Sequence, residues 1–176
     1  MQVLSRQRGV SLIEVLMAVL IFSVGLIGLA GLMVMAARSN HAAYQRTQMT
    51  FLANNMADRM RANPLGIWSG SYDSAAFPIT GTTDCETTAC TPADVAKRDQ
   101  QTWSGLLTTL LPKATASIKC ASKDSLSYSG LNTDQLNRRP PYGGNCAMTI
   151  SWGERGAGDN THSDTAMQTF AWEFQP

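Results

Sequence analysis

The chain contains 176 residues, in which 14 lysine and arginine residues nearly balance 13 aspartate and glutamate residues. Charged residues make up only 15% of the sequence, which argues against a general electrostatic attraction to nucleic acid. This length allows one domain with an appended helix. One end of the chain is strongly apolar and the remainder is polar, so the two parts call for different surroundings.

The first unusual feature is a carboxylate directly before a long apolar run. A short basic leader over residues 1–9 ends in Gly9, and Glu14 stands just before the apolar residues 15–37. A lone charge at the centre of a membrane span costs about 2.5–3.5 kcal/mol on insertion scales. If a protease cuts after Gly9, the new α-amino group of Val10 lies about one helical turn from Glu14. That amine can neutralise the carboxylate within one chain or between neighbouring chains.

Two simpler interpretations of the apolar end explain less. A secretory signal peptide has an apolar region of about 7–15 residues, whereas this run has roughly 23 and follows Glu14. A plain membrane anchor fits the length but leaves Gly9 and Glu14 without a purpose. If the apolar run stays in the membrane, Arg6 and Arg8 mark the cytoplasmic side. The chain beyond residue 37 then faces outward.

Residues 8–16, Arg-Gly-Val-Ser-Leu-Ile-Glu-Val-Leu, resemble the class III signal of type IV prepilins and type II secretion pseudopilins. In that family a peptidase cuts after the glycine and the new N-terminus is methylated. The resemblance therefore implies cleavage between Gly9 and Val10, N-methylation of Val10 and an assembly contact by Glu14. The family usually has phenylalanine where this chain has Val10.

Residues 25–32 and 56–63 extend the resemblance toward the minor pilins. It implies a protein that helps to initiate type IV pilus assembly, enters the fibre and supports twitching motility and adhesion. The implied partners are other minor pilins, the major pilin, the prepilin peptidase, the inner-membrane assembly platform and, before assembly, membrane lipid. The implied location is the inner membrane, crossed once with a periplasmic C-terminal domain, and then the pilus fibre at the cell surface.

Two other functions remain open at this stage. A minor pseudopilin of a type II secretion system would have the same architecture. A membrane-anchored binding domain that never polymerises, such as an adhesin or a DNA-uptake receptor, would also fit the anchor. The sequence has no basic stripe with interleaved aromatic residues, so nucleic acid is an unlikely partner. It also lacks the common catalytic motifs, which predicts that the protein is not an enzyme.

All four cysteines lie in the polar region, which is periplasmic and oxidising in this topology. Four cysteines permit three pairings. Proximity favours a small loop between Cys85 and Cys90, which leaves Cys120 and Cys146 to close a longer one. A metal site is disfavoured because four residues rather than two separate Cys85 from Cys90, with no histidine nearby. We expect structural disulfides, no metal and no cofactor. A calcium loop at Asp159, Asn160, Ser163 and Asp164 matches no spacing that we can defend.

No proline interrupts residues 11–62, which predicts one helix of about 50 residues. Apolar residues in its second half recur at helical spacing and predict a buried stripe of Met49, Leu52, Ala53, Met56 and Met60. Asn63 and Pro64 end this helix. Residues 65–90 are rich in loop-forming residues and predict little regular structure.

A second helix is predicted from Thr91 as N-cap, with Pro92 and Asp94 in its first turn, to Pro112. Its expected buried face consists of Val95, Trp103, Leu106, Leu107, Leu110 and Leu111. Alternating apolar residues then predict three strands of a small antiparallel sheet, at residues 116–120, 148–152 and 170–174. Loops are expected at residues 138–144, on the surface, and 153–166, between the last two strands.

The sequence as a whole predicts an α+β fold. It resembles the ladle of type IV pilins, in which a long N-terminal helix packs on a small antiparallel sheet. Four segments are expected: a cleaved leader (1–9), a membrane and assembly half of the helix (10–37), an amphipathic half (38–63) and a globular domain with disulfides (64–176).

Overall fold

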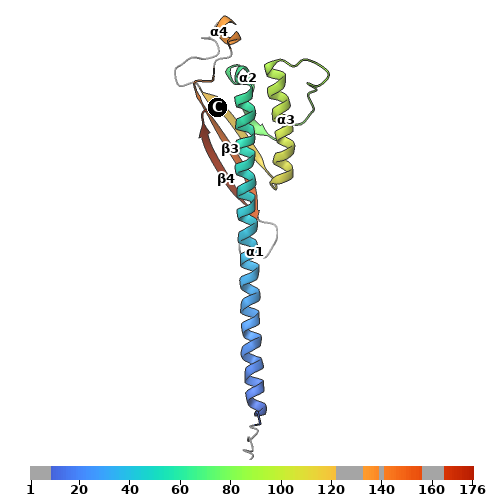
Figure 1. Ribbon diagram of the computed structural model, residues 1–176, viewed down its shortest axis with the longest axis vertical. Helices are drawn as coiled ribbons and strands as arrows, with labels where there is room; N and C mark the ends of the chain where they lie inside the picture. Colours follow the sequence, from blue (N-terminus) through green and yellow to red (C-terminus); the bar gives the residue numbers. More distant parts are fainter. Residues whose placement is uncertain (1–8, 122–132, 139–140, 156–164) are drawn as a thin grey trace, which may run out of the picture. The chain divides into compact units, whose positions relative to one another are not determined.

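A computed structural model describes residues 9–121, 133–138, 141–155 and 165–176 of the chain. These residues fall into two compact units, Met1–His41 and Ala42–Pro176, which are treated separately below. Helix α1 (Leu12–Ala62) starts in the first unit and ends in the second (Figure 1). The predicted long helix is confirmed, with a length of 51 residues.

The second unit holds the last part of α1 and all the other elements. These are α2 (Pro64–Trp68), β1 (Ser74–Phe77), α3 (Pro92–Leu110), β2 (Thr115–Ala121), α4 (Thr133–Asn137), β3 (Asn145–Arg155) and β4 (Thr165–Phe174). The strands form one antiparallel sheet in the order β1-β2-β3-β4. The predicted α+β fold, a long helix packed on a small antiparallel sheet, is therefore confirmed.

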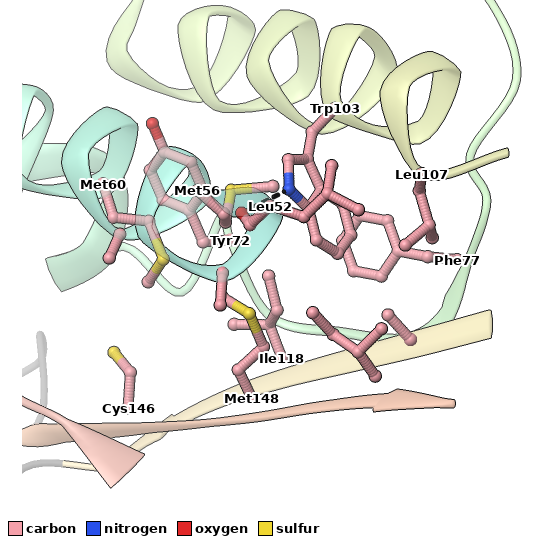
Figure 2. Packing of buried hydrophobic residues seen from close by; sticks show 14 of the residues in the cluster. Leu52, Met56, Met60, Tyr72, Phe77, Trp103, Leu107, Ile118, Cys146 and Met148 are labelled. Carbon is pink, nitrogen blue, oxygen red and sulfur yellow. Dashed lines mark hydrogen bonds between the residues drawn. The ribbon is translucent and has the colours of Figure 1, made fainter. Parts of the chain in front are cut away.

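The apolar stripe on the second half of α1 packs into the core of this unit. Every residue of the predicted stripe is buried, and Leu52, Met56 and Met60 are fully enclosed. Figure 2 shows these side chains between α3 on one side and the sheet, with Ile118 and Met148, on the other. The helical spacing of the stripe is what brings its members onto this one face.

Helix α3 begins as predicted, through a reciprocal cap. The Thr91 hydroxyl accepts a hydrogen bond from the Asp94 backbone N–H (3.2 Å), and the Asp94 carboxylate accepts one from the Thr91 N–H (3.1 Å). Pro92 occupies the first turn, where its missing N–H costs nothing. The cap thus fixes the start of the helix with residues that are adjacent in sequence.

The buried face of α3 differs in part from the prediction. Trp103, Leu107 and Leu111 are buried, but Val95, Leu106 and Leu110 are only half-buried. Their places in the interface are taken by the smaller or polar residues Ala96, Gln100 and Ser104. The polar pair is satisfied: the Gln100 side chain donates to the Ser71 carbonyl, and the Ser104 hydroxyl accepts from the Ile79 N–H (2.8 Å). The large apolar residues of α3 therefore do not all lie on its buried face.

The prediction that residues 65–90 have little regular structure is wrong for α2 and β1. Asn63 and Pro64, which end α1, also begin α2, because the Asn63 side chain accepts a hydrogen bond from the Gly66 N–H. Gly66 fits closely behind that cap, since a Cβ there would lie 2.4 Å from the Asn63 amide nitrogen. Strand β1 then pairs with β2 along an irregular register.

The three predicted strands are confirmed as β2, β3 and β4, and each is longer than predicted. The expected loop 153–166 is too long at both ends, because β3 continues to Arg155 and β4 starts at Thr165. The calcium candidate at residues 159–164 lies outside the described residues. In the segment 138–144, Arg138, Pro141 and Gly143 are exposed, whereas Tyr142 is buried and packs edge-on against Trp68 (4.8 Å between ring centroids), which anchors this segment to the core.

Asp94→Asn should weaken the pH dependence of stability on the acid side. The Thr91 hydroxyl and then the Thr91 N–H bond to the Asp94 carboxylate and lower its pKa. A lowered folded pKa stabilises the fold above the ordinary carboxyl value of about 3.9, and this stabilisation is lost as the pH falls through the folded value. Melting temperatures between about pH 6 and pH 2 should fall less steeply for Asp94→Asn than for the wild type, and equal slopes would contradict the prediction.

Candidate assembly segment

The start of α1 places Glu14 in the first helical turn. The Ser11 carbonyl accepts hydrogen bonds from the backbone N–H groups of Glu14 (3.0 Å) and Val15 (3.3 Å). The helix therefore begins directly after Ser11, and Glu14 lies where unpaired N–H groups give the helix end a partial positive charge. These backbone hydrogen bonds place Glu14 in the first turn of α1, with Val10 just outside the helix.

Neither Glu14 nor the predicted new N-terminus is enclosed by the described part of the chain. Glu14 is exposed, and the side chain of Val10 is 70% exposed. None of the ion pairs formed by the described residues includes Glu14. A carboxylate beside an apolar run has thus been left available for a group from outside these residues.

The apolar half of α1 is uncovered in the first unit. Its large exposed side chains are Val10, Leu12, Ile13, Val15, Leu16, Met17, Val19, Leu20, Ile21, Phe22, Val24, Leu26, Ile27, Leu29, Leu32, Met33, Val34 and Met35. By length and composition α1 is able to cross a membrane. So large an apolar surface needs lipid or another protein to cover it.

Both disulfides lie in the second unit, and they follow the pairing that proximity favoured. Cys85 is joined to Cys90, and Cys120 to Cys146. The second pair lies directly opposite across β2 and β3, with its Cα atoms 4.0 Å apart. Cys146 is fully buried, so this disulfide joins two strands within the core.

A polar cluster at the end of α1 was not predicted from the sequence. Arg59 forms an ion pair with Asp99 of α3 (2.9 Å), and the Tyr72 hydroxyl donates to the same carboxylate (2.7 Å). The Asn63 amide donates to the Pro92 carbonyl (2.7 Å). Burial, followed by the hydrogen bond to Asp99, raises the pKa of Tyr72, so its hydroxyl stays a donor. This cluster ties the end of α1 to α3.

Among the described residues no group of three or more histidine, cysteine or acidic side chains could hold a metal ion. His41 is exposed on α1. The tryptophan of α3, Trp103, is enclosed in the core and donates its ring N–H to the Leu52 carbonyl (2.9 Å). The chemically distinctive feature is therefore the Gly9–Glu14 segment, which the sequence identified.

Two family models match this chain. Residues 4–30 match the prokaryotic N-terminal methylation motif, and residues 31–101 match the family described as type IV pilin Tt1218. Residues 31–101 are thus similar to a type IV pilin domain, and they follow a segment with a prepilin methylation motif. Comparison with curated proteins finds no match. Comparison with solved structures finds none either.

These two matches change how the N-terminal segment is understood. Pilin proteins are structural rather than catalytic, and a prepilin motif implies processing by the prepilin peptidase and assembly with other pilins. The apolar helix and the motif together fit a pilin that is anchored in the inner membrane and then enters a pilus. Gly9, Val10 and Glu14 all lie within the residues that match the methylation motif.

Proposed function

We propose that this pilin is a minor pilin of the PilV type that helps to initiate type IV pilus assembly and is incorporated in the fibre. The peptidase removes residues 1–9 and methylates the new N-terminus at Val10. The helix then waits in the inner membrane until Glu14 pairs with the N-terminal amine of a neighbouring subunit. The observation that carries this proposal is an exposed Glu14 in the first turn of α1, without an ion-pair partner among the described residues.

The uncovered apolar half of α1 supports the same sequence of events. Its side chains are exposed along the helix from Val10 to Met35, so they need lipid before assembly and neighbouring helices afterwards. In this proposal residues 10–37 form the segment that lies first in the membrane and then in the filament core. Residues 38–63 form the amphipathic half of the helix, and residues 64–176 form the periplasmic globular domain. The two disulfides in that last part suit an oxidising compartment.

Mass spectrometry of the mature N-terminus tests this proposal. The chain purified from cells should lack residues 1–9 and carry one methyl group on Val10. Gly9→Val should retain the leader, because a branched side chain then occupies the cleavage position. Gly28→Ala is the matched control: the space around Gly28 is open, so processing should be unchanged. An intact leader on the wild-type chain would overturn the proposal.

A deletion strain distinguishes the pilus from the secretion machine. The methylation motif is common to pilins and pseudopilins, so the match over residues 4–30 does not separate them. We expect loss of twitching motility with normal exoprotein secretion. A defect in secretion alone would assign the chain to the type II secretion system.

A further inference from the structure

The two margins of the sheet are built differently. Strand β1 is only four residues long and its register with β2 is irregular. Strand β4 has ten residues in unbroken register with β3, contains no proline or lysine, and carries a single charge at Glu173. Natural proteins usually protect long edge strands with prolines, lysines or irregular pairing, because the unpaired backbone groups of an edge strand attract other strands. Figure 1 shows β4 at the margin of the sheet, and within β4 there is neither proline nor lysine.

The pairing of β2 with β3 shows which backbone groups of β4 point away from the sheet. The Cys120 N–H donates to the Asp73 side chain (2.9 Å), so it points away from β3. The short Cα distance to Cys146, 4.0 Å, also marks this as a pair without mutual backbone hydrogen bonds. Cys146 therefore directs its N–H and C=O toward β4, where Phe174 lies opposite.

Alternation along an antiparallel ladder then settles the rest of β4. Phe174, Trp172 and Phe170 bond to β3, while the odd-numbered residues direct their N–H and C=O groups to the free margin. Those residues include Met167, Thr169, Ala171 and Glu173. Among the described residues no backbone hydrogen bond to another element reaches them. The margin thus presents an open ladder about ten residues long.

The core face of β4 is also incompletely covered. Phe170 and Trp172 are half-buried, although Ile150 and Met148 directly opposite them on β3 are fully enclosed. The Trp172 ring stacks on that of Phe174 (4.5 Å between centroids), so the partly exposed Trp172 is held in place beside the margin. An additional strand with an apolar side chain at every second position would cover these rings.

We propose that the free margin of β4 binds an extended segment of another exported polypeptide by strand addition. The open ladder requires an extended chain, and the half-buried rings require apolar residues at alternate positions of that chain. Its other residues face solvent beside Thr169 and Ala171 and are therefore polar. This inference rests on the proposed function in one respect, because it places the partner in the compartment to which the domain is exported.

Photocrosslinking in cells tests the proposal with the full-length chain. A benzophenone side chain at Thr169 should yield an adduct with another polypeptide. Moving it to Met167 should move the linked residue of the partner by two positions, since successive residues of a ladder pair in register. Ala171→Pro removes an outward N–H without touching the bonds to β3, and should reduce the adduct roughly tenfold or more. Ala171→Val retains that N–H and should leave the adduct unchanged.

Three results would overturn the strand addition: an adduct only with a second copy of this chain, no two-residue shift, or an adduct unaffected by Ala171→Pro. If Ala171→Pro does not fold, amide exchange of the wild type decides. Residues 167, 169, 171 and 173 should exchange rapidly in the isolated chain and slowly in the assembly, and rapid exchange in both would refute the proposal. No adduct from a processed chain in piliated cells refutes strand addition alone, whereas an intact leader refutes the proposed function.

Discussion

Glu14→Ala should strongly reduce surface pili in a deletion strain complemented with the variant, while the leader is still removed. Glu14 is exposed in the first turn of α1 and directly precedes the apolar span, so an opposite charge from a neighbour stabilises it more strongly there than in water. Removal of that attraction should lower surface pili roughly tenfold or more, since each 1.4 kcal/mol lost is a factor of about ten. Immunoblots of the processed chain and of sheared surface pili measure the two steps separately.

Two further variants show whether the charge itself is required. Glu14→Gln keeps the shape and hydrogen-bonding capacity of the side chain but removes the charge, and should fail in assembly like alanine. Ser23→Ala removes a polar group from the same helix, where the Ser23 hydroxyl merely donates to the Leu20 carbonyl, and should assemble normally. Wild-type amounts of pili with Glu14→Ala or Glu14→Gln would exclude the charge pair as an assembly contact.

The parts of the fold that depend on neighbouring residues could be predicted from the sequence. The start of α3 was found because Thr91, Pro92 and Asp94 act on one another within a single turn. The end of α1 was found because Asn63 precedes a proline. The strands were recognised from their alternation, which the burial of β3 follows: Met148, Ile150 and Trp152 are all buried.

The parts that were missed depend on residues far apart in the chain. Strand β1, Ser-Ala-Ala-Phe, has no alternating apolar pattern and is held by pairing with β2 more than 35 residues later. Asp99 gives no sign in the sequence that it meets Arg59 and Tyr72, because Arg59 lies in α1, Asp99 in α3 and Tyr72 in the turn before β1. The buried Gln100 and Ser104 were overlooked because their partners lie at Ser71 and Ile79.

The candidate assembly segment was predictable for the opposite reason. Gly9, Val10 and Glu14 are close in sequence, so their relation to one another does not depend on the rest of the fold. The roles of these residues could therefore be predicted from the sequence without knowledge of the fold. The structure places Glu14 in the first turn of α1. The partner that we propose for it belongs to another subunit, so the sequence of one chain does not reveal that contact.

Trp103→Ala should cause the largest loss of stability in the second unit. The Trp103 side chain is fully buried where α3, α1 and β1 meet: it donates to the Leu52 carbonyl and lies edge-on to Phe77, with ring centroids 5.1 Å apart. Truncation of a buried tryptophan to alanine removes apolar burial and leaves a cavity, which costs about 3–5 kcal/mol. That is a large part of a typical free energy of unfolding of about 5–15 kcal/mol.

Comparison with Trp103→Phe separates packing from the hydrogen bond. Phenylalanine keeps most of the ring volume but loses the donor to Leu52, and a typical hydrogen bond contributes about 0.5–1.5 kcal/mol. Phe51→Ala is the control: this ring on α1 is 52% exposed, so its removal should change stability by less than about 0.5 kcal/mol. Denaturant unfolding with the disulfides intact measures all three variants. If Trp103→Ala cost no more than Phe51→Ala, the contact between α1 and α3 would not be what holds the amphipathic half of the helix to the domain.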